Sequence, residues 1–253
     1  DWSSDVCSSD LIALVSGAGA PGGIGFAIAQ TLKKSGAKVH ITSTSERIIN
    51  RAKEIGASAT IADLTVTSDC QRVVAELPAL DIVVNNAGMT ALNDAAQLDE
   101  SGNLTDVTLE GFRRGIARNV ETAFNLTKHA LPLLRQSSSG RIIMISSVTG
   151  PQMAMRQQPV YATAKAALLG LVRSLALDEA KSGITANAVL PGWIATDTQN
   201  EFEQMQGSRS PLGRSGKPEE IASLVNWLAS SSSSYLTGQC LIVDGGNSIA
   251  EER

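Results

Sequence analysis

The most informative pair of side chains in this sequence is Tyr161 and Lys165, four residues apart in the segment YATAK. Residues at this spacing lie on one face of a helix, so the pattern predicts an ammonium group beside a phenol. A free phenol ionises near about pH 10, and a neighbouring positive charge lowers that pKa. The pair is therefore predicted to exchange protons with a substrate. The same spacing also arises by chance on solvated helices, so other motifs must decide.

The composition is that of an ordinary globular α/β protein. The 253 residues are 43% hydrophobic and 18% charged, which provides enough apolar side chains for a full core. A net charge of −4 gives no basic surface for a phosphodiester backbone, so we expect no nucleic-acid partner. Isolated histidines and cysteines form no metal-binding pattern, and scattered cysteines indicate a reducing cytoplasm. Arg173 interrupts the longest apolar run, AALLGLVRSLAL, and we expect no membrane span.

The first ten residues, DWSSDVCSSD, differ in pattern from the rest of the chain. They show no hydrophobic periodicity and precede a clear strand, LIALVS. They resemble a translated sequencing adapter of the kind found in metagenomic assemblies; a poorly ordered natural leader is the alternative. We therefore expect residues 1–10 to be a non-native or disordered leader, and residues 11–253 to form a single domain.

Short apolar segments alternate with helical patterns along the rest of the chain. Strands that are buried on both faces have continuous apolar sequences, as these segments do. We predict strands at 11–16, 38–43, 59–62, 81–86, 141–146, 184–189 and 240–244. Helices are predicted over 26–36, over 112–136 and from about residue 160 onward. This alternation predicts an α/β fold, a Rossmann-like doubly wound parallel sheet of seven strands with helices on both faces.

A glycine-rich loop joins the first predicted strand to the first predicted helix. The segment SGAGAPGGIG carries glycines at 17, 19, 22, 23 and 25. Glycine allows a tight turn and a close approach of the backbone to a pyrophosphate, which free N–H groups at the following helix N-terminus bind. Dinucleotide binding is the favoured interpretation, although ordinary tight turns also use glycine.

The end of the second strand is expected beside the adenosine ribose of such a dinucleotide. An acidic residue there would bind the 2′-hydroxyl of NAD, but residues 42–45 read TSTS. Hydroxyl groups accommodate a 2′-phosphate, and Arg47 is close enough in sequence to reach it. We therefore expect NADP(H) to be preferred over NAD(H). Glu46 supports the alternative, NAD, if its carboxylate reaches the ribose.

Taken in order, these motifs resemble those of the short-chain dehydrogenase/reductase family, in its single-domain branch, over about residues 11–249. GGIG (22–25) resembles the cofactor turn in a slightly longer loop, and PGWIAT (191–196) resembles the loop beside the nicotinamide. ADL (62–64), NNAG (85–88) and YLTGQCLIVDGGNS (235–248) are further matches. The resemblance implies cofactor binding by Ser16, Gly17, Gly19, Gly23, Ile24, Gly25, Ser43, Thr44, Asp63, Leu64, Asn86, Ala87, Gly88, Lys165, Pro191, Gly192, Ile194 and Thr196.

The resemblance also implies a catalytic tetrad of Asn119, Ser147, Tyr161 and Lys165. In the family, hydride passes between a nicotinamide and a carbonyl or alcohol carbon while the tyrosine exchanges a proton with the oxygen. The serine binds the same oxygen, the lysine holds the nicotinamide ribose, and the asparagine holds a water for proton return. Ser146 competes for the serine role, with a backbone-bonded strand end as the alternative. Asn119 could instead mark a helix kink.

The substrate is expected under the segment 197–213, because in the family the loop after strand six and its short helix usually cover the substrate. Met153, Trp193, Phe202 and Met205 are candidate apolar substrate contacts, and ordinary packing is the alternative. The segment 89–110 is longer than usual in the family, and its acidic residues (Asp94, Asp99, Glu100, Asp106 and Glu110) favour a solvated surface loop. Similarity to 3-oxoacyl-(acyl carrier protein) reductases suggests a ketone or 3-oxoacyl-type substrate, although an acidic loop would repel an acidic carrier protein.

Other classes of protein share parts of this pattern. Sugar-nucleotide epimerases and dehydratases also combine a glycine loop with YxxxK, but they usually carry a longer substrate domain. A cofactor-sensing regulator would keep the fold without chemistry, and an NAD-dependent alcohol dehydrogenase of the same fold is a further alternative. The intact Ser–Tyr–Lys set favours an oxidoreductase acting on a small-molecule carbonyl substrate. The family is usually tetrameric, so we expect a homotetramer.

Overall fold

The structure is a computed structural model that describes residues 10–88 and 99–251. Residues 1–9, which include Cys7 and nearly all of the expected leader, lie outside the described part. So do residues 89–98, which include Asp94 of the acidic segment, and residues 252–253.

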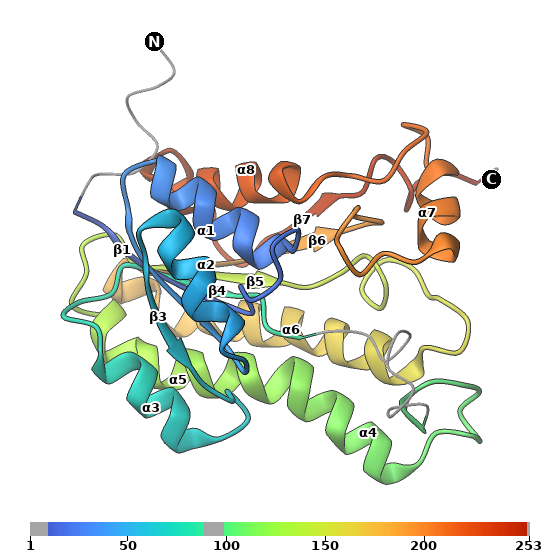
Figure 1. Cartoon of the computed structure of the whole chain (residues 1–253), viewed down its shortest axis with the longest axis horizontal. Helices are drawn as coiled ribbons and strands as arrows, with labels where there is room; N and C mark the ends of the chain where they lie inside the picture. The colour runs from blue at the N-terminus through green and yellow to red at the C-terminus, as the bar shows by residue number, and fades with distance from the viewer. Residues whose placement is uncertain (1–9, 89–98, 252–253) are drawn as a thin grey trace.

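One parallel sheet contains all seven predicted strands, in the order β3-β2-β1-β4-β5-β6-β7 (Figure 1). The strands are β1 Ile12–Ser16, β2 Lys38–Ser43, β3 Ser58–Ile61, β4 Ile82–Asn85, β5 Arg141–Ile145, β6 Thr185–Pro191 and β7 Cys240–Val243. The predicted fold class is confirmed, and each predicted strand end lies within two residues of the observed one. The strand order reverses between β1 and β4, which places a crevice-forming switch point at their carboxyl ends.

Helices cover both faces of this sheet (Figure 1). On one face lie α1 (Ile24–Lys34), α2 (Arg47–Ile55) and α8 (Pro218–Ala229). On the other lie α3 (Thr67–Ala75), α5 (Thr122–Leu134) and α6 (Pro159–Asp178). The chain enters α5 from α4 (Leu109–Ile116), and α7 (Glu201–Ser208) lies beyond the carboxyl ends of the strands. Two short 3₁₀ segments, η3 (Ala180–Ser182) and η4 (Ser231–Ser233), follow α6 and α8.

Each face of the sheet has its own apolar core. Neighbouring residues of a strand point to opposite faces, so Val83 packs with α3, α5 and α6 while Ile82 and Val84 pack with α1 and α8. Burial on both faces is the reason that the strands have continuous apolar sequences rather than an alternating pattern.

The predicted single helix over 112–136 is wrong in its start and in its continuity. It begins at Leu109, where Thr108 Oγ1 accepts a hydrogen bond from Gly111 N at 2.9 Å. A π-helical segment, η2 (Ala117–Glu121), then separates α4 from α5. Within η2, Asn119 Nδ2 donates to the Gly115 carbonyl at 3.0 Å, so a side chain competes with the backbone ladder. Hydrophobic periodicity does not report such a widened turn.

The helix that carries Tyr161 begins at Pro159, which occupies the first helical turn without loss of a backbone hydrogen bond. By length and apolar composition, α6 is the one helix among the described residues that meets the criteria for a membrane span. It is a core helix instead, because it packs along β6 and contributes Leu168 and Val172 to the apolar core.

Candidate functional site

The carboxyl ends of β1 and β4 are joined by side-chain hydrogen bonds at the switch point of the sheet. Ser16 Oγ accepts from the backbone N–H groups of Asn86 and Ala87, both at 3.0 Å. Asn86 Nδ2 in turn donates to the carbonyls of Ser16 and Gly17, both at 3.1 Å. The glycine loop is therefore fastened to the start of the NNAG turn, where doubly wound sheets bind their ligands.

The glycines of this loop are required by close packing. Gly17 has φ +68°, and a Cβ there would lie 2.9 Å from Ala87 Cα. A Cβ on Gly19 would lie 2.8 Å from Ser43 Oγ, and one on Gly25 would lie 2.4 Å from Asn86 Nδ2. The loop leads directly into α1, whose N-cap, Gly23, makes no side-chain capping bond. This cradle of backbone N–H groups at a helix N-terminus fits a dinucleotide pyrophosphate.

The predicted adenosine end of the site lies at the end of β2. Ser43 is half-buried against Gly19, whereas Thr44 and Glu46 are exposed. Arg47 is also exposed, and its Nε donates to Ser45 Oγ at 3.4 Å. The segment therefore presents hydroxyl groups and one guanidinium beside the glycine loop.

The segment after β3 supplies the two residues predicted to hold the adenine. Asp63 Oδ1 accepts hydrogen bonds from Thr65 N at 3.0 Å and from Thr65 Oγ1 at 2.7 Å, which shapes a tight turn. Leu64 is buried, and its carbonyl accepts from Asn125 Nδ2 of α5 at 3.3 Å. Both residues are thus positioned by local hydrogen bonds at the carboxyl edge of the sheet.

The predicted catalytic serine, tyrosine and lysine come together between β5 and α6. Lys165 Nζ lies 5.5 Å from the centroid of the Tyr161 ring, as expected for residues on one helix face. The Ser147 hydroxyl lies near enough to Tyr161 to lower the pKa of the phenol. Ser146 Oγ instead donates to the Lys165 carbonyl at 2.8 Å. This contact is the backbone-bonded alternative for Ser146, and it leaves Ser147 beside the phenol.

We expected Lys165 to lower the pKa of Tyr161, but the pKa of this phenol is raised. Burial raises the pKa of Tyr161; the Ser147 hydroxyl opposes this rise, and the negative charge of Glu203 adds to it. Burial also lowers the pKa of Lys165, to about 8. Lys165 is only 4% exposed, and its Nζ donates to the Ile145 carbonyl at 3.2 Å. The lysine is directed at a backbone oxygen, so desolvation rather than the ammonium charge decides the tyrosine pKa.

Asn119 lies beside the NNAG turn. It is 2% exposed, and a Cβ on Gly88, which has φ +140°, would lie 2.6 Å from Asn119 Oδ1. The π-helical segment that carries Asn119 also contacts α6. The turn after β4, the widened helix turn and the tyrosine helix therefore meet at this point.

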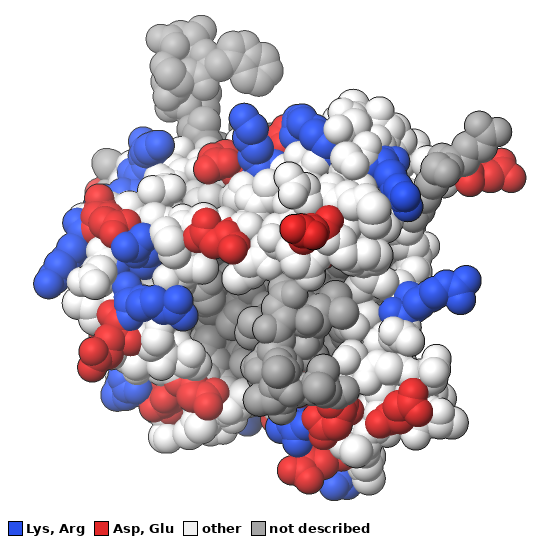
Figure 2. Space-filling model, turned by 45° about the vertical axis from the view of Figure 1, so that its right-hand side comes forward, with Lys and Arg blue, Asp and Glu red and all other residues white. Residues whose placement is uncertain are grey.

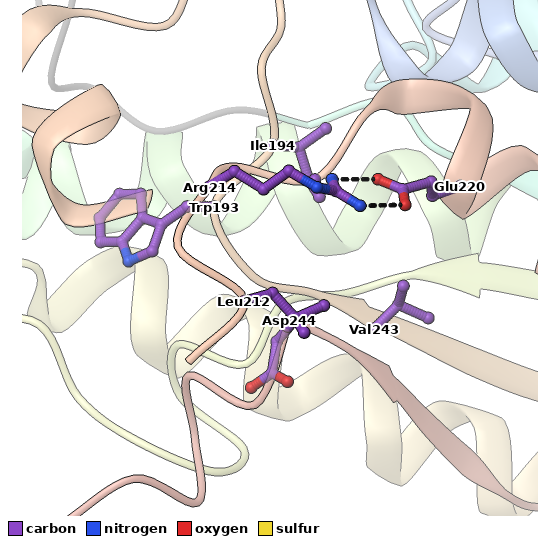
Figure 3. Close-up of a pocket in the computed structure, with 9 residues that line it drawn as sticks. Trp193, Ile194, Leu212, Arg214, Glu220, Val243 and Asp244 are labelled. Atoms are coloured by element: carbon purple, nitrogen blue, oxygen red, sulfur yellow. Dashed lines mark hydrogen bonds and ion pairs between the residues drawn. The ribbon is translucent and has the colours of Figure 1, made fainter. Parts of the chain in front are cut away.

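Backbone hydrogen bonds connect the PGWIAT loop to β7 and to residues 214–216, which lie around it in Figure 3. Gly192 N donates to the Val243 carbonyl at 3.0 Å, and Gly216 N donates to the Trp193 carbonyl at 2.8 Å. A cavity of about 80 Å³ lies here, lined by Trp193, Ile194, Leu212, Arg214, Gly216, Glu220, Val243, Asp244 and Gly245. This cavity is too small for a dinucleotide, and we interpret it as part of the support for the loop.

An ion pair of two hydrogen bonds closes this cavity on one side. The Arg214 guanidinium donates to both carboxylate oxygens of Glu220, at 2.7 and 2.8 Å (Figure 3). The hydrogen bonds from Arg214 lower the pKa of Glu220 to about 2. The pair links the segment between α7 and α8 to the first turn of α8, and it stays charged at neutral pH.

The four predicted substrate contacts do not form one cluster. Trp193 and Phe202 meet edge to face, with ring centroids 6.3 Å apart. Met205, one turn further along α7, is 42% exposed. Met153 follows Ser147, and its Sδ accepts a hydrogen bond from Asn247 Nδ2 at 3.3 Å. The negative charge of Glu203 contributes to the raised pKa of Tyr161, which indicates that α7 lies near this phenol.

One hydrogen bond near α7 and the ion pairs of the acidic segment were not anticipated from the sequence. Asp197 Oδ2 accepts a hydrogen bond from Gly22 N at 2.6 Å, which connects the segment before α7 to the glycine loop. The acidic segment is not simply solvated where it is described, because Asp99 and Glu100 pair with Arg114, and Glu100 also pairs with Arg118. The expectation of a solvated loop is thus wrong for Glu100, which is buried by partners that the sequence does not reveal. It agrees with Asp99, whose side chain is 34% exposed, and with the exposed Asp106 and Glu110. Within the described residues, 10–88 and 99–251, no group of three His, Cys, Asp or Glu side chains is arranged as metal ligands.

We predict that Gly25→Ala disrupts the glycine loop. The new Cβ would also lie 2.6 Å from the Gly17 carbonyl oxygen, and overpacking of this kind costs about 1–3 kcal/mol. Thermal unfolding and cofactor titration should show a lower melting temperature and at least about 10-fold weaker cofactor binding. The matched control is Gly170→Ala in α6, where a Cβ meets nothing within 4 Å. Equal behaviour of the two variants would contradict the assignment.

Comparison with known proteins agrees with this geometry. A family described as Enoyl-(Acyl carrier protein) reductase matches residues 17–248. A 3-oxoacyl-(acyl-carrier-protein) reductase of Rickettsia felis is 35% identical over 235 residues, covering 90% of this chain and 93% of the relative. A tropinone reductase homologue of Arabidopsis thaliana is 34% identical over 253 residues, covering 93% of this chain and 92% of the relative.

Solved structures show the same similarity. A dehydrogenase/reductase from Sinorhizobium meliloti superposes with a TM-score of 0.86 at 32% identity, covering 97% of this chain and 98% of that one. An aldohexose dehydrogenase of Thermoplasma acidophilum in ligand-free form superposes with a TM-score of 0.84 at 30% identity, covering 96% of both chains. The chain therefore belongs to the short-chain dehydrogenase/reductase family, whose members are NAD(P)-dependent oxidoreductases.

Proposed function

We propose that this protein is an NADP(H)-dependent reductase of a small-molecule ketone or 3-oxoacyl-type compound. The observation that carries the proposal is the meeting of Ser147, Tyr161 and Lys165 at the carboxyl edge of the sheet, next to a glycine cradle for a dinucleotide. The names of the Rickettsia and Arabidopsis relatives both denote carbonyl reduction, which supports the direction of the reaction.

In the proposed complex, the glycine loop from Gly17 to Gly25 and the N-terminus of α1 bind the pyrophosphate. Lys165 binds the ribose hydroxyls next to the nicotinamide, and Ile194 and Thr196 bind its carboxamide. When bound, the nicotinamide supplies the hydride. The protein provides position, hydrogen bonds and an environment shielded from water.

Tyr161 is the proposed general acid. Because burial raises its pKa, the phenol keeps its proton at neutral pH until negative charge develops on the substrate oxygen. Ser147 donates a second hydrogen bond to the same oxygen and stabilises that charge.

Lys165 and Asn119 are proposed to restore the tyrosine proton. Burial lowers the lysine pKa to about 8, which leaves the amine mostly protonated at pH 7 but able to release a proton. Asn119 is proposed to hold the water that links the amine to solvent.

We predict that kcat falls above about pH 8, because the lysine loses its proton there. A pH profile of kcat measures this loss.

We predict that Tyr161→Phe retains cofactor binding and lowers kcat by about 100-fold or more, because the variant lacks the proton to be transferred. Steady-state turnover and cofactor titration, performed on the same preparation, separate the two effects. The mutation leaves the ring and its packing in place, so loss of binding is not expected. Turnover close to that of the unaltered protein would eliminate the acid role.

The cofactor preference is proposed from the end of β2. Ser43 lies against the glycine loop, and Arg47 is exposed beside the hydroxyl groups of residues 43–45. A guanidinium and hydroxyls suit a 2′-phosphate, whereas a carboxylate would suit a free 2′-hydroxyl. Glu46 is the only carboxylate of this TSTSER segment, and it is exposed at the N-cap of α2.

We predict that Arg47→Ala weakens NADPH binding by about 10-fold and leaves NADH binding within about 2-fold, because only NADPH carries the 2′-phosphate. Fluorescence titration with both reduced cofactors measures the ratio. Glu46→Gln is the matched control at the neighbouring position and should improve NADPH binding slightly. A loss that is equal for both cofactors would indicate that Arg47 does not contact the phosphate.

The decisive assay for the function follows cofactor absorbance with a panel of ketones, aldehydes and β-keto esters, using NADPH and NADH side by side. Oxidation of NADPH in the presence of a carbonyl compound supports the reductase. Faster turnover with NADH supports the NAD-dependent dehydrogenase instead. Cofactor binding without turnover on any compound supports a sensor.

The surface favours a small-molecule substrate over an acidic carrier protein. On the face shown in Figure 2, acidic and basic residues are interspersed around the centre. An acidic carrier docks best on a surface of one opposite sign, because complementary fields guide association. The proposed substrate is therefore a free carbonyl compound or keto ester.

Cys70 and Cys240 are free thiols, which suits the proposed cytoplasmic location.

A homotetramer is proposed from the family and from exposed apolar side chains on the relevant helices. Phe112 of α4 is 36% exposed, Phe124 of α5 is 49% exposed, and Leu177 of α6 is 80% exposed. Pairing of these helices across a two-fold axis would bury such residues.

We predict a tetramer in multi-angle light scattering, and Phe124→Glu should shift the protein toward smaller species. A monomeric unaltered protein would contradict the proposal.

A further inference from the structure

A buried carboxylate lies where the helices of the proposed catalytic residues meet. Glu100 belongs to the acidic segment that is longer than usual in the family, yet it is only 3% exposed. A Cβ on Gly115 of α4 would lie 2.3 Å from Val160 Cγ1 and 3.4 Å from Glu100 Oε2. The Glu100 carboxylate therefore lies beside the contact between α4 and the first turn of α6.

The partners of this carboxylate are two arginines, Arg114 on α4 and Arg118 on η2. Arg118 pairs with Glu100 Oε2, and Arg114 Nε lies 3.5 Å from Glu100 Oε1. Arg118 Nε is buried and has no hydrogen-bond partner of its own. Glu100 thus supplies the negative charge that Arg118 requires, since a buried charge is tolerated only when it is paired.

Arg118 directly precedes Asn119 in the π-helical segment η2. Asn119 Nδ2 donates to the Gly115 carbonyl, the same residue that lies against Val160 and Glu100. Val160 in turn directly precedes Tyr161. The Glu100–Arg118 pair is therefore one residue removed from Asn119, and Gly115 lies between its carboxylate and the side chain of Val160.

We infer that Glu100 is a positioning residue that fixes the widened turn of η2, and through it the place of Asn119 relative to Tyr161. The catalytic part of this inference rests on the proposed function, in which Asn119 serves proton return. The same arrangement makes Glu100 an internal support of the site, in contrast to the exposed Asp106 and Glu110.

Asp99 provides the matched control because it comes from the same segment and also pairs with an arginine. Its side chain is 34% exposed, and it contacts Arg114 and Thr108 rather than Arg118. Asp99→Asn removes one carboxylate charge from the segment without touching the pair beside Asn119. It should change kcat by less than about 2-fold, as exposed pairs contribute little.

Glu100→Gln should lower kcat about 10-fold while the stoichiometry and affinity of cofactor binding stay unchanged. If Glu100 acts through Asn119, then Asn119→Ala added to Glu100→Gln should lower kcat no further than Asn119→Ala alone. Independent, multiplicative losses would overturn the inference, as would an unchanged kcat in Glu100→Gln.

Hydrogen exchange tests the positioning without any turnover. Amides of residues 112–124 should exchange at least about 5-fold faster in Glu100→Gln than in Asp99→Asn. This readout decides the structural claim even if no substrate is found, whereas failure of the proposed function would show in the unaltered protein. If Glu100→Gln does not fold, Glu100→Gln with Arg118→Gln leaves no charge unpaired. Native exchange and normal kcat in that double variant would refute the role.

Discussion

The proposed site depends on a reciprocal pair of contacts between β5 and α6. Lys165 Nζ donates to the carbonyl of Ile145, and Ser146 Oγ donates back to the carbonyl of Lys165. Both contacts are buried, where a hydrogen bond left unmade is costly. They fix one face of α6 against the strand end that carries Ser147, so the phenol of Tyr161 is held beside the serine.

Burial has opposite consequences for the two titratable groups on that helix face. It raises the pKa of Tyr161 and lowers the pKa of Lys165, because the charged form of each group loses hydration. The two pKa values move apart, so the Lys165 ammonium becomes a stronger acid than the Tyr161 phenol and can return a proton to a tyrosine that has lost one. A core helix that excludes water therefore prepares the acid and its proton donor by the same physical means.

Much of the fold follows from the sequence because strands buried on both faces have continuous apolar runs, and the glycine loop is identified by its place between a strand and a helix. The π-helical segment was not predicted, since hydrophobic periodicity does not report the side-chain contact from Asn119 to Gly115 that accompanies it. The burial of Glu100 depends on Arg118, which is distant in the chain. The tyrosine pKa was misjudged because helical spacing reveals a neighbouring charge but not desolvation. The roles of the site residues stay predictions.

The capping of α7 has a consequence for where the chain tolerates substitution. Asn200 and Glu203 each cap the backbone of the other, at 2.8 and 2.9 Å, so this short helix stabilises its own first turn. Its side chains at Phe202 and Met205 are about half exposed and contribute little to the cores. Substitutions at Phe202 and Met205 should therefore cost little stability, whereas truncation of the buried Leu168 or Val172 of α6 would leave a cavity in the core.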